Sequence, residues 1–324
     1  MSERKGGVAV LFAGRKRVSA GLYVGGRSFV YLALEESGGE VRVAASSSGT
    51  FQSQLGNGGS PFSASEAELS RAFGRVASSV KAARRREVNL AVPMTESLLR
   101  VIPMQGLTRA EAQKAFRYEA ERHFPFGSDD CVYDLDEIDY PLGGGSSERR
   151  FVVSAARRKT AEGVCRAARS CGISFGAMEP EQTAIERAAS PAFPSEGGCV
   201  CVYAGIERSL VIFVWRGCGI YYRNIALGTD AGGRSLDEGA AALAEEVRAS
   251  VQFGLSRNEG FAFDDIFLFG PGAAGRFCAV LSDVFPERGV KTVFPERRFG
   301  LDFPSCEGWT AALGLALREY DGQA

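Results

Sequence analysis

Residues 18–45 have the sequence VSAGLYVGGRSFVYLALEESGGEVRVAA, in which two pairs of glycines separate three apolar runs. Apolar and β-branched residues favour strands, and glycine pairs between such runs favour tight turns. We therefore expect three short strands over 18–24, 29–34 and 41–45. The Ser/Gly-rich stretch that follows, 46–61, is expected to be a long exposed loop.

A helix is expected directly after this loop, over 65–83. Ser65 and Glu68 have the spacing of a capping box, in which each side chain accepts a hydrogen bond from the other residue's backbone N–H. Apolar residues at helical spacing form one face of this helix: Leu69, Phe73, Val76 and Val80. A strand over 88–92 comes next. A three-strand meander, a helix and a further strand together indicate an α/β unit.

The middle of the chain has a different pattern. Thr108 and Glu111 form a second capping box ahead of a helix over 108–122, and a helix over 159–171 is expected to end at Gly172. Strands are expected over 98–102, 132–138, 151–155 and 173–178, the second and third joined by a flexible Gly143–Ser147 loop. The segment is expected to form a compact α+β insertion, which its last strand closes.

The second half repeats the theme of strand, glycine turn, strand and later helix. Ser235 and Glu238 form a third capping box ahead of a helix over 236–252. Strands are expected over 199–203, 210–215, 220–227 and 266–269. A helix of small residues over 309–320 is expected to end the chain.

Composition excludes several classes of function. The formal net charge is −1, so no global field attracts nucleic acid or anionic lipid. The apolar run nearest the start, Val8–Ala13, is far shorter than the roughly 20 residues of a membrane span. The one histidine, His123, lies where a helix ends, which favours packing over catalysis. We expect a cytoplasmic protein without direct membrane insertion, without catalytic residues and without nucleic acid as a partner.

Cysteine spacing gives no metal site. The eight cysteines are scattered, at positions 131, 165, 171, 199, 201, 218, 278 and 306. Cys199 and Cys201 would share one face of a strand, and no second pair completes a set of ligands. Reduced thiols without metal are therefore expected.

Several segments resemble the PilM family of type IV pilus assembly proteins. SLLRVIPMQGLTRAEAQKAFRYEAERHFPF, 97–126, is similar to that family's strand, proline, acidic helix and "IPF" succession. FVVSAARRKTAEGVCRAARSCGISFGAMEPEQTAIERA, 151–188, is similar to its next strand, helix, turn and strand. AALGLALREY, 311–320, matches its closing "GLALR" signature, and GLYVGGRSF, 21–29, extends the similarity toward the start.

Two related families share the fold. GspL of type II secretion continues into a membrane span, and the cell-division protein FtsA usually adds an amphipathic membrane-targeting tail. The sequence here stops at Ala324 shortly after the closing helix and has neither feature. We therefore expect a PilM-like protein rather than one of these relatives.

The resemblance implies an α/β, actin-like (ribonuclease H-like) fold of two lobes with an inserted α+β subdomain. The expected division is as follows: 1–93 for the N-terminal part of the first lobe, 94–179 for the inserted subdomain, 180–197 for the return to the first lobe and a linker, and 198–324 for the second lobe.

The resemblance also locates three loops that bind nucleotide in active relatives. Two carry a "D-I-G" motif in this family, and here they are Tyr23-Val24-Gly25 and Tyr203-Ala204-Gly205. Tyrosine is neutral near pH 7 and cannot replace a carboxylate as a Mg²⁺ ligand. The third loop is Gly270-Pro271-Gly272, where proline removes a donor. The candidate cofactor-binding residues are Gly25, Gly26, Ser28, Gly205, Gly270 and Gly272.

Besides a role in efficient ATP hydrolysis, two other roles for these glycines stay open. They could serve backbone geometry alone, in ordinary turns. They could also bind nucleotide weakly without competent Mg²⁺, with Arg27 or Arg208 against phosphate. We expect no cofactor and no metal, and no efficient ATPase activity.

The function implied by the resemblance is a scaffold at the inner face of the cytoplasmic membrane, held there through its partners. Such proteins bind the N-terminal cytoplasmic tail of the membrane protein PilN in a groove beside the inserted subdomain, and other platform or motor components are expected partners. Self-association stays open. The alternatives are an actin-superfamily ATPase or sugar kinase and a filament-forming actin homologue; Tyr203 and Glu207 disfavour a sugar kinase.

Overall fold

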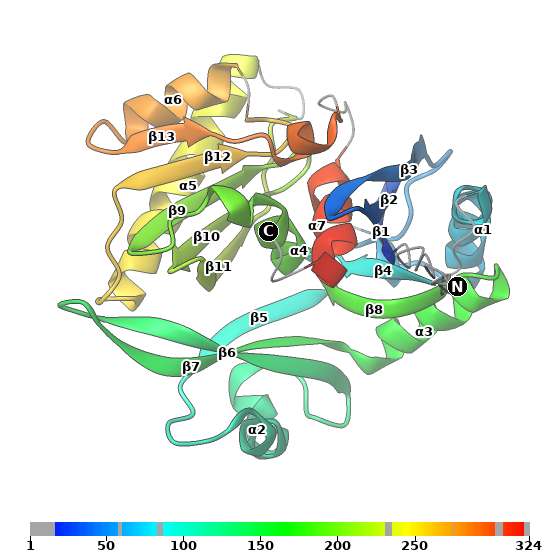
Figure 1. Cartoon of the computed structure of the whole chain (residues 1–324), viewed down its shortest axis with the longest axis horizontal. Helices are drawn as coiled ribbons and strands as arrows, with labels where there is room; N and C mark the ends of the chain where they lie inside the picture. The colour runs from blue at the N-terminus through cyan, green and yellow to red at the C-terminus, as the bar shows by residue number, and fades with distance from the viewer. Residues whose placement is uncertain are drawn as a thin grey trace, which may run out of the picture.

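The computed structural model describes residues 17–57, 60–82, 87–230, 235–273, 275–301 and 307–320. The run Val8–Ala13, Cys306 and the side chain of Val80 lie outside this description. Within it the strands form two five-stranded sheets and one three-stranded sheet. Figure 1 shows the two larger sheets next to one another, with the small sheet below them.

The first large sheet has the order β3-β2-β1-β4-β8, in which β1 to β3 are antiparallel and β4 and β8 run parallel to β1. Its strands are β1 (Arg17–Val24), β2 (Ser28–Ser37), β3 (Glu40–Thr50), β4 (Glu87–Val92) and β8 (Ser174–Pro180). One face is covered by α1 (Glu66–Ala82) and α3 (Arg158–Ser170), which share an apolar core with the sheet.

The second large sheet repeats this plan, with the order β11-β10-β9-β12-β13. Its strands are β9 (Gly198–Ala204), β10 (Ser209–Trp215), β11 (Cys218–Ile225), β12 (Asp265–Phe269) and β13 (Gly289–Thr292). The helices α5 (Leu236–Arg257) and α6 (Arg276–Val284) pack on one face. The internal repeat predicted from the sequence is thus present as two similar sheets.

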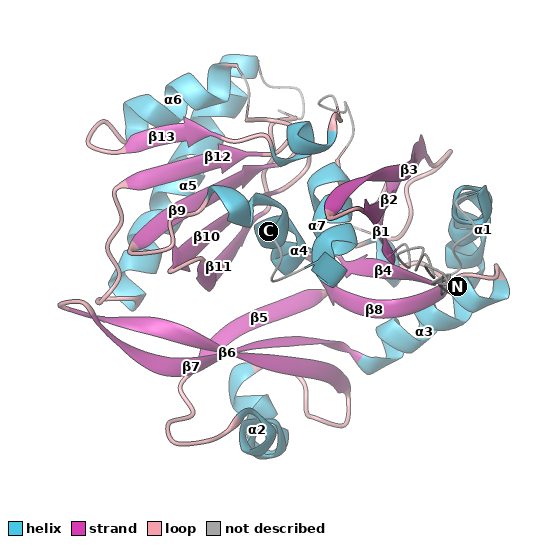
Figure 2. Ribbon diagram, in the orientation of Figure 1, coloured by secondary structure: helices cyan, strands magenta, loops and turns pink. Residues whose placement is uncertain are grey.

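The small sheet has the order β5-β7-β6. Its strands are β5 (Ser97–Ile102), β6 (Cys131–Gly143) and β7 (Ser146–Arg157), and α2 (Arg109–His123) packs against one face. Figure 2 shows α2 on the side of this sheet that faces away from the lobes. The tip of the β6–β7 hairpin rests on the second lobe, where the Tyr140 hydroxyl donates to Asn258 and Arg216 pairs with Asp139 at 3.5 Å.

Two helices lie between the large sheets (Figure 1): α4 (Glu181–Ala189) and α7 (Trp309–Leu317). Residues of both helices share one apolar core with both sheets. Their small residues allow close contact, because a Cβ on Gly314 would lie 1.7 Å from the Ala184 carbonyl oxygen. The remaining helical segments are short 3₁₀ turns: Pro61–Ser63, Ser190–Ala192, Pro295–Phe299 and Arg318–Tyr320.

The five helices predicted with explicit limits are confirmed, the last of them, over 309–320, as α7 and the 3₁₀ turn that follows it. α1, α2 and α3 lie within one residue of the expected 65–83, 108–122 and 159–171, and α5 begins at the expected residue 236 and continues five residues past 252. All three capping boxes form, with Ser65, Thr108 and Ser235 each hydrogen-bonded to the glutamate three residues later.

Three expectations for local structure were wrong. The strand expected at 173–178 joins the first large sheet beside β4 instead of closing the inserted unit. The Ser-rich stretch begins as strand, since β3 continues to Thr50 opposite β2. The Gly143–Ser147 segment, expected to be a flexible loop, is a tight turn, and its Gly143 backbone lies against Gly260 of the second lobe.

Candidate functional site

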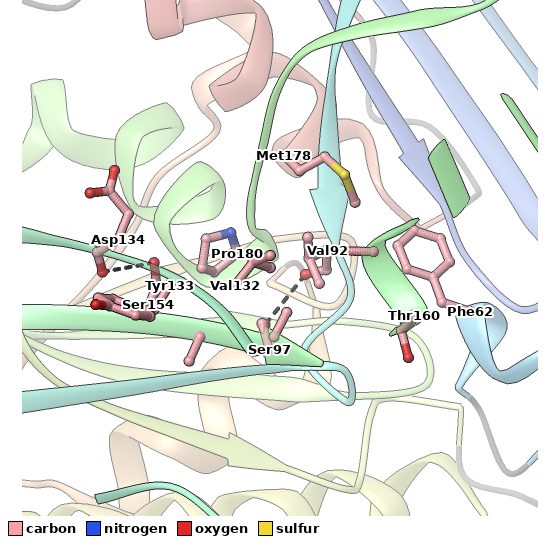
Figure 3. A pocket seen from close by; sticks show the side chains of 13 residues that line it. Phe62, Val92, Ser97, Val132, Tyr133, Asp134, Ser154, Thr160, Met178 and Pro180 are labelled. Carbon is pink, nitrogen blue, oxygen red and sulfur yellow. Dashed lines mark hydrogen bonds between the residues drawn. The ribbon is translucent and has the colours of Figure 1, made fainter. Parts of the chain in front are cut away.

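A groove runs between the inserted sheet and the first lobe (Figure 3). At one end it is mostly apolar, with a volume of about 160 Å³. The first lobe contributes Phe62, Val92, Met178 and Pro180, and the inserted sheet contributes Val132 on the facing side. Val132 is 37% exposed although it is apolar. This end can therefore bury apolar side chains of a ligand.

The floor of the groove is built by the period-two alternation of β6 and β7. Three cross-strand pairs line it: Val132 with Ala156, Asp134 with Ser154, and Asp136 with Val152. The residues between them, such as Leu135 and Val153, pack into the core beneath α2. Successive side chains of a strand point to opposite faces, so one ribbon supplies both the core and the groove floor.

The other end of the groove is larger and more polar, with a volume of about 520 Å³. The two ends share Asp134, Ser154, Met178 and Pro180, so they are continuous. Glu179 is buried there and pairs with both Arg187 and Arg318. This ion-pair cluster fixes α4 and the end of α7 beside the groove.

The strand β8 forms the border of the groove on the side of the first lobe. Within the described residues β8 has one strand neighbour, β4, and it is the last strand of its sheet. Its opposite edge is therefore an edge of a sheet, and Met178, Glu179 and Pro180 of this strand line the groove. An edge strand offers backbone donors and acceptors to an added strand.

The first predicted phosphate loop is the hairpin turn between β1 and β2. The Gly25 N–H donates to the Ser28 carbonyl at 2.8 Å, which closes the turn. The ring of Tyr23 fills the turn, since a Cβ on Gly25 would lie 2.7 Å from the Tyr23 hydroxyl. The same ring contacts Gly308, whose φ of +99° also favours glycine.

The second and third loops enclose Tyr203 in the same way. A Cβ on Gly205 would lie 3.0 Å from its ring, and one on Gly270 would lie 2.8 Å from it. The loops are also bonded to each other, because the Gly272 N–H donates to the Ala204 carbonyl at 2.8 Å. Tyr203 thus fills the interior that the two glycine loops enclose.

Two glutamates face the same region. Burial raises the pKa of Glu181, at the start of α4, to about 7, although the Met94 N–H and Arg208 partly oppose the shift. Burial and the neighbouring Glu181 and Glu207 raise the pKa of Glu307 to about 8. Protonated carboxyl groups there are therefore present near neutral pH.

The space around these groups is small. The cavity that Tyr23, Gly25, Gly26, Arg208 and Glu307 line has a volume of about 20 Å³. That is room for roughly one water molecule, whereas pockets for small-molecule ligands hold roughly 300–1,000 Å³.

The two tyrosines at the turns offer no anionic oxygen to a metal ion. Among the residues that the structure describes, no three His, Cys, Asp or Glu side chains are arranged to hold a metal ion. Burial raises the pKa of Tyr23 and of Tyr203 well above 10, so both hydroxyls stay neutral. Neutral tyrosine hydroxyls beside a cavity of about 20 Å³ do not fit a Mg²⁺–nucleotide.

The structure brings most of the predicted loop residues together. Gly25 and Gly26 lie on the small cavity, while Gly205 and Gly270 reach the same region through contact with Tyr203. Gly272 lies further away, against Thr229, and Ser28 closes the hairpin through its backbone.

Sequence reasoning missed several residues of both regions. Glu181 and Glu307 belong to no motif, and the helix that positions Glu181 was not among those expected. The groove residues carried no local pattern either, because they come from segments far apart in the chain. The one available signal was the period-two alternation of the strand at 132–138, which leaves Val132 on the face opposite the α2 core.

Comparisons with known proteins give one matching family model and several similar structures. The family model of the type IV pilus assembly protein PilM matches residues 24–240. No curated protein sequence matches the chain.

The structure is similar to the PilM–PilN type IV pilus biogenesis complex, with a TM-score of 0.71 and 21% identity over 93% of this chain and 98% of that one. It is similar to the ethanolamine utilization protein EutJ from Carboxydothermus hydrogenoformans, with a TM-score of 0.51 and 11% identity over 94% of this chain and 91% of that one. The cytoplasmic domain of EpsL, from the type II secretion system of Vibrio cholerae, gives a TM-score of 0.47 and 12% identity over 83% and 95% of the two chains.

The predicted fold is therefore confirmed: the molecule is actin-like, with two lobes and an inserted α+β subdomain. No helix among the described residues is both long enough and apolar enough to cross a bilayer. The family model covers well over half of the sequence. The chain belongs to the family of the type IV pilus assembly protein PilM.

Proposed function

We propose that this protein is a cytoplasmic scaffold of a type IV pilus machine, and that it binds the cytoplasmic tail of a PilN-like membrane protein without nucleotide. It would lie at the inner membrane through that partner. Family membership supports the assignment to a type IV pilus machine. The similarity to a solved PilM–PilN complex supports a PilN-like protein as the partner. The division of the chain at residues 93 and 197 remains part of this proposal. The boundary expected at 179 moves back to the end of β7 at Arg157, because α3 packs on the first sheet and β8 joins it.

The observation that carries the proposal is the groove between β8 and the inserted sheet. It has an apolar end, a polar end and a sheet edge along one side. An extended peptide that adds to such an edge gains affinity from backbone hydrogen bonds and specificity from alternate side chains in pockets. We place the apolar side chains of the tail against Met178 and Val132.

We also propose that the three nucleotide loops form a degenerate site. Tyr23 and Tyr203 stand where the family motif has carboxylates, and their rings fill the turns. The cavity beside them holds about 20 Å³. Tail binding is therefore proposed to be independent of ATP, and the protein is proposed not to be an efficient enzyme.

The test is titration of a synthetic peptide with the tail sequence of the PilN-like protein encoded beside this gene. Micromolar affinity without nucleotide is expected, because ordering a free tail costs part of the interaction energy. Ser154→Arg would place a long charged side chain on the groove floor and is expected to weaken binding about tenfold or more. Tyr118→Arg is the matched control, since Tyr118 is 88% exposed on α2, on the opposite face of the sheet.

Equal affinity of the wild-type and Ser154→Arg proteins would exclude this groove as the binding site. Absence of a complex with and without ATP, together with ATP hydrolysis by the purified chain, would overturn the scaffold and favour an enzyme.

A further inference from the structure

The carboxylate of Glu307 lies inside the second glycine turn. One of its oxygens is 2.5 Å from the position that a Cβ would take on Gly205. The carboxylate interacts with the backbone N–H groups of Ile206 and Glu207, the residues that follow this glycine. The turn therefore directs its amide groups at a side chain of the protein itself.

The turn is held in place by backbone bonds from a neighbouring loop. The Thr229 N–H donates to the Gly205 carbonyl at 2.9 Å, and the Asp230 N–H donates to the Ile206 carbonyl at 2.9 Å. A Cβ on Gly228 would lie 2.1 Å from that Ile206 carbonyl oxygen, so the two loops touch. The amide groups that face Glu307 are thus fixed by contacts that do not involve Glu307.

Successive backbone N–H groups in such a turn form an anion site. A carboxyl group and a phosphate both present acceptor oxygens to it, and a neutral Glu307 does so without the cost of burying a charge. Glu307 is followed by Gly308, which contacts the ring of Tyr23 in the first turn. The same two residues therefore contact both glycine turns, Glu307 directly at the second and Gly308 through the ring of Tyr23 at the first.

We infer that Glu307 is a built-in substitute for a phosphate group, and that its carboxylate keeps the second turn closed to oxyanions. The inference deepens the proposed nucleotide-independent function, because it names the group that takes the place of the ligand. It does not depend on tail binding, since Glu307 is not among the residues that line the groove.

Removal of the carboxylate should expose a preformed site for a small oxyanion. Tyr203 still lies between the second and third loops in that case, so a whole nucleotide is not the expected ligand. Inorganic phosphate is the probe, because a single tetrahedral anion needs only the turn.

The experiment compares thermal unfolding of the wild-type, Glu307→Ala and Glu207→Ala proteins in millimolar sodium phosphate and in sodium chloride of equal ionic strength. Phosphate is expected to raise the Tm of Glu307→Ala by roughly 2 °C or more and to leave the Tm of wild type unchanged. Glu207→Ala is the matched control, because it removes an exposed carboxylate from the same turn. It is expected to behave as wild type.

An equal response of all three proteins, or none from Glu307→Ala, would overturn the inference. If Glu307→Ala does not fold in chloride, refolding from urea gives the answer: recovery in phosphate alone supports the inference, and failure in both salts contradicts it. Tail-peptide affinity of the folded Glu307→Ala protein is expected to equal that of wild type, so failure of the groove proposal would show separately.

Discussion

At the scale of single residues, the two tyrosines change the character of the glycine turns. An aspartate in a phosphate loop carries charge and leaves the turn open for a ligand. Tyr23 is 7% exposed and Tyr203 is fully buried, and each ring contacts the glycines beside it. The turns are therefore packed as part of the protein core, and Glu181 is buried with them.

Glu181 gives this packing a measurable pH dependence. Its pKa is about 7 in the folded protein and near 4.5 in the unfolded chain, so the folded state binds an extra proton between these values. Its contribution to stability is therefore full below pH 4.5 and is lost as the pH rises toward 7. The free energy of unfolding of Glu181→Gln relative to wild type is expected to increase by about 1–3 kcal/mol from pH 5 to pH 8.

Several groups interact with Glu181 and enter this prediction: Arg208, Glu307, Tyr23 and Tyr203. Urea unfolding at a series of pH values measures it. Glu68→Gln is the control, because the pKa of Glu68 is shifted in the opposite direction. Hydrogen bonds from Ser65 lower the pKa of the Glu68 carboxyl, so its contribution to stability is lost as the pH falls below about 4.5 and does not change between pH 5 and pH 8. A constant difference between Glu181→Gln and wild type across this range would show that Glu181 is ionised in the folded protein.

At the scale of elements, α4 and α7 depend on small residues more than on helix propensity. α7 has the sequence WTAALGLAL and is buried along most of its length between the sheets. Gly314 lies against the backbone of Ala184 in α4, and Gly21 of β1 lies against the Ala312 carbonyl. The helix can occupy this place because its side chains leave room for neighbouring backbone.

Gly314→Ala is therefore expected to destabilise the protein by about 2 kcal/mol or more, since the added Cβ meets backbone atoms that cannot move independently. Gly74→Ala is the matched control, because Gly74 is exposed in α1 and a Cβ there meets nothing within 4 Å. It is expected to stabilise by about 0.5–1 kcal/mol through helix propensity. Urea denaturation measures the change in the free energy of unfolding for both variants. A change of the same sign in both would contradict the packing argument.

At the scale of the whole molecule, one apolar core joins the two lobes. It contains residues of both large sheets and of the two helices between them. In addition, Glu307 and Gly308 reach the second and the first glycine turn respectively. Contacts of the chain itself therefore connect the lobes at the two glycine turns.

Mg-ATP is accordingly expected neither to bind tightly nor to change the Tm of the protein. Calorimetric titration should give no binding, or binding no tighter than high micromolar, because the available cavity is about 20 Å³. The Tm at millimolar Mg-ATP should match that in Mg²⁺ alone at equal ionic strength. A sub-micromolar dissociation constant that requires Mg²⁺ would contradict our assignment of the turns.

Local chemistry determined much of this fold from the sequence alone. The capping boxes at Ser65, Thr108 and Ser235 fixed three helix starts, because a cap needs only residues three apart. Glycine pairs placed the first hairpin. Tyr23 and Tyr203 led to the prediction of degenerate phosphate loops, which stays a prediction. Each of these signals is contained within a few neighbouring residues.

Only the tertiary structure decided what depends on segments far apart in the chain. β8 follows the inserted unit in sequence but joins the first sheet, since β4 offers it a parallel partner. The groove takes Val132 from one sheet and Met178 from the other. Glu307 enters a turn a hundred residues earlier, and its raised pKa comes from burial there. Burial and long-range contact are properties of the folded arrangement, and no local pattern carries them.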